Sequence, residues 1–238
     1  MFFFKQTEEK KFQKLFKWAD KFSLPENKFP RDIDLLSRMT KLDLSGNQIT
    51  QIPSEIENLT ALSCLNLSNN EITSIPQSIC ELKNLKKLYL DENRITTVLQ
   101  EIEGLVDLEE LALHGNQISR FPQEVLKLVN LEKLHLDDNQ IIEIPSTIEN
   151  LKKLTALYLD ENRLTQLPKE IGNLTNLLEL NLANNQITHL PSQIGELIEL
   201  VKLNVSHNKI SKLPKEIKNL LDLSWLNIDG NKIEDLSS

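Results

Sequence analysis

The residues best suited to chemistry in this sequence recur at one interval. Steps of 23 residues, or twice that, relate the members of two sets, which are Tyr89, His135 and Tyr158, and Asp91, His114, Asp137 and Asp160. Imidazoles and carboxylates bind metal ions, carboxylates also bind basic ligands, and tyrosine is a frequent anchor in protein interfaces. These residues can act together only if the chain stacks with that period.

An asparagine marks the same period along most of the chain. The nine residues that carry it are each 23 positions from the next, without insertion or deletion, and are Asn47, Asn70, Asn93, Asn116, Asn139, Asn162, Asn185, Asn208 and Asn231. Around each, the pattern is L-x-x-L-x-L-x-x-N-x-I-x-x-I-P-x-x-I-x-x-L, with Leu, Ile, Val, Met or Phe at the apolar places. Nine equal steps predict a solenoid in which each turn packs on its neighbours.

This pattern resembles the leucine-rich repeat, in the 23-residue form seen in Ras-suppressor and Scribble-type proteins and in many bacterial repeat proteins. The stretch from Leu88 to Arg94, repeated unchanged from Leu157 to Arg163, is typical of it. The resemblance implies an α/β, right-handed, curved solenoid with a parallel concave β-sheet and short helical or 3₁₀ segments on the convex side. That family mostly uses its scaffold to hold other proteins, which implies an interaction role.

Each repeat contains a strand segment and a return segment. In L-x-x-L-x-L the leucines are expected to point inward from a short strand, and neighbouring strands to stack in parallel about 4.8 Å apart. The return segment has apolar residues three to four apart and a proline near its start, replaced once by Leu99, and predicts a short helix or 3₁₀ turn. We assign the asparagines to structure, because a side-chain amide can bond backbone groups of two adjacent loops.

The first residues predict a cap. Residues 7–22 have the pattern of an amphipathic helix with Thr7 as N-cap, and its apolar side is Phe12, Leu15, Phe16, Ala19 and Phe22. Its lysines would suit a membrane surface, but we favour a role in covering the open end of the core. Residues 24–38 keep the return-segment pattern without a strand. The chain therefore divides into a cap and half-repeat at 1–38 and nine repeats at 39–238.

The other end has no predicted capping helix. The last strand, Leu223 to Ile228, is followed by only ten residues, among them Ile233, Leu236 and Ser238. An unpaired sheet edge favours a homodimer through this C-terminal end, and a shield formed by Trp225 within one chain is an equal alternative.

Residues between the inward leucines are expected on the concave surface, because side chains alternate along a strand. Four such positions in nine repeats hold four Lys against ten Asp and Glu, a net charge of -6 in a chain of formal net charge -8. The predicted partner-binding patch lies in the central repeats and comprises Tyr89, Asp91, Glu92, His114, Lys133, His135, Asp137, Asp138, Tyr158, Asp160 and Glu161. The alternative is a solvated face with good strand formers.

Four of these residues are also the candidate metal ligands. His114, His135, Asp137 and Asp160 would supply two imidazoles and two carboxylates to zinc. Nothing in their spacing requires a metal, and side chains on a flat sheet usually diverge, so we expect no metal and no cofactor. A zinc-binding or self-associating structural protein, of the virulence type, is the alternative function.

Motifs of enzyme chemistry are missing from the sequence. It has no G-x-x-x-x-G-K-[ST], H-E-x-x-H or G-x-S-x-G, and Cys64 has no histidine in a neighbouring strand column to act as its base. We therefore expect no enzyme, but a scaffold for a protein or peptide with a basic surface.

The net charge, the cysteines and the apolar runs of the chain indicate its partners and its compartment. A net charge of -8 disfavours nucleic acid and anionic membranes as partners. Cys64 and Cys80 lie at different phases of the repeat, which predicts free thiols and a reducing compartment. The apolar run at the start is too short for a secretory signal, and no apolar run of about 18 residues follows. The prediction is a cytoplasmic protein, with export without a cleaved signal as the alternative.

Overall fold

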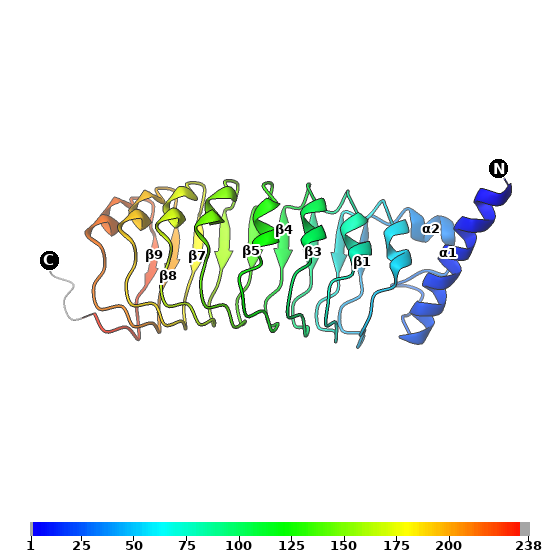
Figure 1. Cartoon of the computed structure of the whole chain (residues 1–238), viewed down its shortest axis with the longest axis horizontal. Helices are drawn as coiled ribbons and strands as arrows, with labels where there is room; N and C mark the ends of the chain where they lie inside the picture. Colours follow the sequence, from blue (N-terminus) through cyan, green and yellow to red (C-terminus); the bar gives the residue numbers. More distant parts are fainter. Residues whose placement is uncertain (1, 234–238) are drawn as a thin grey trace.

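The computed structural model describes residues 2–233, and of residues 2–8 the backbone alone. It is an elongated solenoid (Figure 1). The helix α1 (Phe2–Lys21) lies at one end, and the strands follow in chain order along the long axis. Short helical turns line one long side of the body and irregular loops line another.

Nine three-residue strands form one parallel sheet in sequence order. They are β1 Lys41–Asp43, β2 Cys64–Asn66, β3 Lys87–Tyr89, β4 Glu110–Ala112, β5 Lys133–His135, β6 Ala156–Tyr158, β7 Glu179–Asn181, β8 Lys202–Asn204 and β9 Trp225–Asn227. Each strand residue pairs with its equivalent one repeat later, as Leu88 does with Leu111. Equal repeat lengths thus put the columns expected from the sequence in register, which confirms the predicted fold class.

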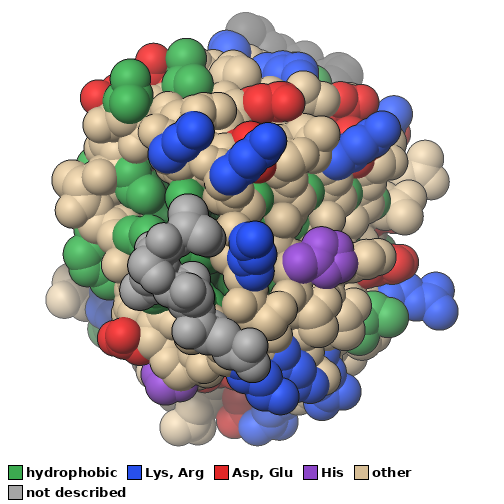
Figure 2. Space-filling model, turned by 90° about the vertical axis from the view of Figure 1, so that its left-hand side faces the viewer, with side chains coloured by type: hydrophobic (Ala, Val, Ile, Leu, Met, Phe, Trp, Pro, Cys, Tyr) green, Lys and Arg blue, Asp and Glu red, His purple; other side chains and the backbone are tan. Residues whose placement is uncertain are grey.

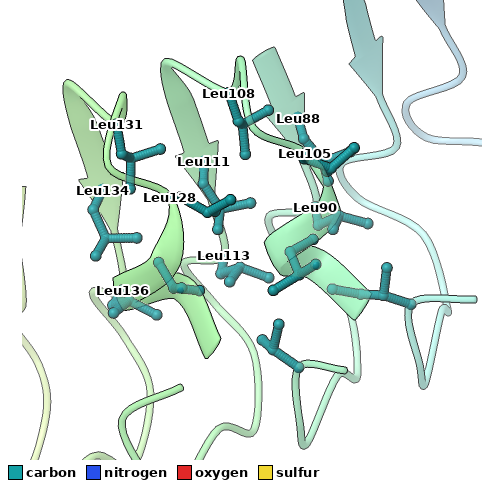
Figure 3. Close-up of a cluster of buried hydrophobic side chains, with 14 of the residues drawn as sticks. Leu88, Leu90, Leu105, Leu108, Leu111, Leu113, Leu128, Leu131, Leu134 and Leu136 are labelled. Carbon is teal, nitrogen blue, oxygen red and sulfur yellow. The ribbon is translucent and has the colours of Figure 1, made fainter. Parts of the chain in front are cut away.

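The return segments are 3₁₀ helices, as their spacing predicts. They are η1 Ser54–Asn58, η2 Gln77–Glu81, η3 Gln100–Gly104, η4 Gln123–Lys127, η5 Ser146–Asn150, η6 Lys169–Asn173, η7 Ser192–Glu196 and η8 Lys215–Asn219. Proline, or Leu99 before η3, is the extended residue that precedes each of them. Strand and return-segment leucines interlock in one continuous core, shown for three turns in Figure 3, where Leu111, Leu128 and Leu134 are fully buried.

One position in each 3₁₀ turn sets how closely the return segments approach. Gly172 and Gly195 occupy it in η6 and η7, and a Cβ on Gly195 would lie 2.4 Å from the carbonyl oxygen of Glu216. In η4 the same position holds the buried Leu126. There Pro122 has ψ 97°, whereas its equivalents have ψ between 142° and 152°. The convex side is therefore tight over η6 to η8 and more open beside η4.

Asn162 illustrates the structural role predicted for the asparagines. Its side-chain N–H groups donate to the carbonyl oxygens of Leu136, Leu159 and Asp160 at 2.8, 3.2 and 3.1 Å. Its side-chain oxygen accepts from the N–H of Ile141 at 2.9 Å. Two of these four groups belong to its own turn and two to the preceding turn, so the amide joins adjacent turns. The prediction is confirmed.

The amino-terminal helix covers the end of the core. Phe12, Leu15 and Ala19 are buried, as predicted. The helix starts at Phe2, so the prediction that Thr7 caps it was wrong. Thr7 lies inside the helix because no Pro or Gly before it ends the helical backbone. Within residues 2–233, no helix is both long and apolar enough to cross a bilayer.

Contacts made by residues outside the predicted apolar side of the helix also hold this cap in place. Trp18 is buried, and its indole N–H donates to the carbonyl oxygen of Gln51 at 2.8 Å. Lys14 Nζ lies 2.7 Å from Glu55 Oε1 of η1. A short helix, α2 (Ile33–Ser37), follows in the segment expected to lack a strand.

The C-terminal turn leaves apolar side chains at the surface. Leu221 is 88% exposed, and Trp225 and Leu226 of β9 are 46% and 38% exposed. Figure 2 looks onto this end and shows hydrophobic side chains among polar and basic ones. Trp225 is thus about half covered, and the homodimer and the shield formed by Trp225 both stay predictions. Leu236 and Ser238 lie outside the described residues.

Candidate functional site

The central concave surface spans the strands β3 to β7, and the sheet brings its predicted residues together in rows. The backbone ladder continues past each strand, because the N–H of Glu92 donates to the carbonyl of His114 at 2.9 Å and that of Asp138 to Asp160 at 2.9 Å. Asp91, His114, Asp137 and Asp160 therefore follow one another on adjacent turns. The structure thus places these four residues in one column, as the repeat length predicts.

The residue after each member of this column bends the chain. Glu92, Asp138 and Glu161 have φ of 50°, 47° and 53°, in the left-handed region. This bend ends the extended segment and returns the side chain to the concave side, where Glu92 Oε1 lies 3.7 Å from His114 Nε2. Strand alternation alone does not account for these acids, so that part of the sequence interpretation was wrong.

Two aromatic rings form the centre of the surface. His135 on β5 and Tyr158 on β6 are stacked, with centroids 4.6 Å apart and planes at 18°. Burial lowers the pKa of His135, which favours the neutral ring. Burial and a hydrogen bond to Glu179 raise the pKa of Tyr158 to about 12. The Tyr158 hydroxyl donates that bond to Glu179 Oε2 at 2.8 Å, which holds the ring in place.

Sequence reasoning missed the ion pairs beside these rings. Lys87 Nζ lies 2.8 Å from Glu110 Oε2, and Lys202 Nζ lies 2.7 Å from Glu179 Oε1. In both pairs the partners occupy equivalent positions of adjacent strands, at the first strand residue. That sequence signal, opposite charges one repeat apart, was available. Lys133 of β5 forms no such pair among the described residues.

The aspartates of the column are less well neutralised. Burial raises the pKa of Asp137, and burial together with the Asp137 charge raises that of Asp160 to about 6. Within residues 2–233, no Lys, Arg or His side-chain nitrogen lies within ion-pair distance of either carboxylate. Asp137 Oδ1 is buried without a hydrogen-bond donor. The central surface thus holds negative charge close together.

The four candidate zinc ligands do not converge. His114 Nδ1 lies 2.8 Å from Asp91 Oδ1, whereas His135 stacks on Tyr158. In the part of the chain that the structure describes, no three His, Cys, Asp or Glu side chains form a metal-binding group. Cys64 and Cys80 are both free thiols.

A surface cavity of about 790 Å³ lies on the side of the return segments, and its lining includes Phe121, Pro122 and the exposed Ile142. It coincides with the open spacing beside η4. None of the predicted concave residues lines this cavity, which has mixed charge from Arg120 and Glu143.

Comparison with known proteins identifies the repeat. A family model described as leucine-rich repeat region matches residues 20–114 and 95–186, and one described as leucine rich repeat matches residues 175–233. The chain belongs to the leucine-rich repeat family. Proteins with this repeat are in general interaction scaffolds. No curated protein matches this leucine-rich repeat chain.

Solved structures show the same architecture. A leucine-rich repeat protein of Leptospira interrogans is 34% identical with a TM-score of 0.79, and the match covers 88% of this chain and 60% of that one. For an internalin of Listeria monocytogenes the values are 26% and 0.74, covering 87% and 60%. The ectodomain of an Arabidopsis thaliana receptor kinase, solved in complex with Casparian strip integrity factor 2, is 33% identical with a TM-score of 0.75, covering 81% and 24%. This leucine-rich repeat chain therefore spans 60% or less of each neighbour's length.

Proposed function

We propose that this leucine-rich repeat chain is a non-enzymatic scaffold whose concave surface holds a basic segment of another protein. The observation that carries the proposal is the distribution of neutralised and unneutralised acids. Glu110 and Glu179 each have a lysine partner, whereas Asp137 and Asp160 have none among the described residues. Carboxylates left unpaired on one face favour a ligand that brings positive charge.

The tyrosines support the same proposal. An anchor binds best when its side chain is already held in one position, because less conformational freedom is lost on binding. Tyr158 is held by its hydrogen bond to Glu179 and by the stacked ring of His135. Tyrosine is enriched among interface hot spots, which cluster near the centre of an interface.

Backbone conformation adds support. Left-handed φ is unfavourable for residues other than Gly, Asn and Asp, by roughly 1 kcal/mol or more. The equivalent bends at Gly46, Gly115 and Gly230 use glycine, yet Glu92 and Glu161 place glutamates there. These two strained acids lie in the central turns, where the proposal places the ligand.

Two neighbours agree with a binding role. The structure of one plant ectodomain contains Casparian strip integrity factor 2, and a second structure is described as PEPR1-AtPEP1. These statements concern those proteins. For this chain they support peptide or protein binding, while the basic character of the ligand comes from its own surface.

The test is selection from a random peptide library, followed by binding measurements on the selected peptides at low and moderate salt. We expect Lys- and Arg-rich peptides, with affinity that falls as salt rises because exposed charges are screened. The variant Tyr89→Ala/Tyr158→Ala should lose most of the affinity. The matched charge control, Glu103→Gln/Glu143→Gln on exposed convex positions, should keep it. Selection of acidic or uncharged peptides, or equal loss in both variants, would refute the proposal.

Self-association is a second candidate, favoured by the exposed Leu221, Trp225 and Leu226 of the C-terminal turn. Sedimentation velocity over a range of concentrations tests it. A dimer that Leu221→Lys/Trp225→Lys abolishes would support this interface. A monomer throughout the range, or a dimer that the substitutions leave intact, would exclude it. A cytoplasmic location, with export as the alternative, also remains a proposal.

A further inference from the structure

We infer that the solenoid bends at a joint between its fourth and fifth turns, and that this bending changes the spacing between the two halves of the concave binding surface. The fourth turn carries β4 and η4, and the fifth carries β5 and η5. The existence of the joint concerns the fold alone, whereas its effect on binding rests on the proposed function. Packing on the convex side, bonding in the sheet and the positions of the tyrosines together support it.

The convex side is poorly filled along the fourth turn. The cavity of about 790 Å³ beside Phe121 shares Gln123 with a second cavity of about 320 Å³, and the second shares Leu126 and Asn150 with a third of about 550 Å³. Together the three form one groove along η4 and against η5, which we call the convex groove. Among neighbouring 3₁₀ helices of residues 2–233, η4 and η5 are the least closely packed. Side chains that face empty space lose the attraction of close packing, so little holds η4 and η5 at one separation.

Other turns are fixed firmly on this side. A Cβ on Gly172 of η6 would lie 2.5 Å from the carbonyl oxygen of Gln193 in η7, and one on Gly195 of η7 would lie 2.4 Å from that of Glu216 in η8. Backbones that approach so closely leave no space for these helices to move toward one another. The turns from η6 to η8 therefore form a stiff block, whereas the convex groove leaves η4 and η5 room to approach.

The concave side of the same joint is bonded. The strands β4 and β5 pair in the parallel ladder, and beyond them the N–H of Leu113 donates to the carbonyl of His135 at 2.9 Å. Leu111 and Leu134, from the two sides of the joint, lie fully buried in one core (Figure 3). A sheet that stays bonded while the opposite side is open acts as the axis of a hinge. Rotation about this axis changes the distance between η4 and η5 far more than the distance between β4 and β5.

An ion pair that restrains other neighbouring strands is missing at this joint. Glu110 on β4 and Lys133 on β5 occupy paired positions and have opposite charges, yet they form no ion pair within residues 2–233. Glu110 Oε2 instead lies 2.8 Å from Lys87 Nζ, on its own side of the joint. Across the joint, His135 Nε2 lies 3.9 Å from Glu110 Oε1, beyond hydrogen-bond reach. The strands β4 and β5 thus lack the ion pair that restrains β3 against β4.

The convex groove also sets the direction of the motion. Val129 and Ile142, which line its third and first cavities, are 54% and 53% exposed, and closure of the groove would cover them. Covering apolar side chains is favourable. Motion the other way would open the filled core around Leu111, which costs free energy. The chain should therefore populate a second state, in which the groove is closed and the sheet is flatter.

This joint divides the predicted binding surface. Tyr89 lies on β3, before the joint, whereas His135 and Tyr158 lie on β5 and β6, after it, and are stacked on each other. Flattening of the sheet therefore moves Tyr89 away from the stacked pair. A ligand that contacts both tyrosines stabilises the state whose spacing it fits. The joint thus lets the concave surface adjust its curvature to the basic segment.

Spin labels at equivalent positions of alternate turns measure the motion. Gln100 and Ser146 are exposed and are the first residues of η3 and η5, and Lys169 and Lys215 are exposed and have the same places in η6 and η8. The first pair spans η4 and the second spans η7, and each pair is two repeats apart. The labelled chains are Gln100→Cys/Ser146→Cys and, as the matched control, Lys169→Cys/Lys215→Cys.

Double electron–electron resonance gives the distance distribution of each pair, in a Cys64→Ala/Cys80→Ala background. A groove that admits water is at least about 3 Å wide. We therefore expect the pair that spans η4 to show a second population, shorter by about 3 Å, and the pair that spans η7 to show one narrower population. Equal distributions in the two pairs would overturn the joint.

A side chain that fills the convex groove should block its closure. Asn150 is exposed and lines two of the three cavities, whereas Asn219 is exposed at the equivalent position of η8. Asn150→Trp should remove the shorter population from the pair that spans η4, and Asn219→Trp should keep it. Circular dichroism checks that each labelled variant folds. If both substitutions remove the shorter population, or neither does, that population is not closure of the groove and the inference is overturned.

Peptide binding separates the joint from the proposed function. Saturation with a selected Lys- and Arg-rich peptide should leave one population in the pair that spans η4 and should not change the pair that spans η7. Two populations in unchanged proportion would overturn the effect of the joint on binding. If no basic peptide is selected, the proposed function falls, whereas the comparison of the two pairs without peptide still decides whether the joint exists.

Discussion

Replacing Asn162 by alanine tests how the turns are joined. The side-chain amide makes four hydrogen bonds to backbone groups of two turns, at 2.8 to 3.2 Å, and the residue is 7% exposed. A net hydrogen bond contributes about 1 kcal/mol, and a buried group left without a partner costs about as much or more. The expected loss in the free energy of unfolding is therefore about 4 kcal/mol.

The assay is urea unfolding followed by circular dichroism, with Asn176→Ala as the matched control. Asn176 is exposed, and its amide donates one hydrogen bond, to the carbonyl of Lys152 at 2.7 Å. With a slope of about 3 kcal/mol per molar urea, Asn162→Ala should lower the midpoint by more than about 1 M. The control should change it by about a fifth of that or less.

A position effect should accompany this loss. Asn231, in the last turn described, makes similar bonds but is more exposed, so water can replace its amide at less cost. Asn231→Ala should therefore shift the midpoint less than Asn162→Ala. If Asn162→Ala shifts the midpoint no more than Asn176→Ala does, the amide does not join the turns and the reasoning is refuted.

Three further substitutions have expected outcomes. Asp160→Asn should raise the free energy of unfolding at pH 7 by about 1 kcal/mol after allowance for partial exposure. Burial and Asp137 raise the Asp160 pKa to about 6, so the wild-type carboxylate is destabilising above that pH. The stability that Asp160→Asn adds should therefore shrink below pH 6 and vanish below about pH 4. Urea titrations at several pH values measure this dependence. Gly195→Ala should cost about 1–3 kcal/mol, because its Cβ would meet the Glu216 backbone at 2.4 Å, whereas Gly104→Ala, facing the flexible end of Lys83, should be nearly neutral in thermal melts. Glu161→Gly should add about 0.5–1 kcal/mol by relieving left-handed φ, and should weaken binding of selected basic peptides; a loss of stability would show that the bend is not strained.

Much of the fold could be predicted from the sequence, because it depends on a local pattern repeated at constant length. Leu88 and Leu111 are in register because 23 residues separate them and every repeat adds the same number. The structural role of Asn162 followed from the same regularity. A side chain that can satisfy two loops is needed once in every turn.

The start of α1 was harder to predict. Thr7 has the chemistry of an N-cap, but local preference yields when the preceding backbone can continue the helix. The part that Trp18 plays in fastening the cap also depended on where Gln51 lies in the first turn. Such contacts join segments that sequence periodicity does not relate.

In the candidate site, too, some features follow from the sequence and others from the tertiary structure. The sequence by itself determined which residues share a column, and so brought Tyr158, His135, Asp137 and Asp160 into one region of the concave sheet. Only the tertiary structure decided that Glu179 is neutralised by Lys202 while Asp160 is not, and that left-handed bends carry further acids to the same face. Column membership follows from repeat length alone, whereas pairing and burial depend on distances between side chains of different turns.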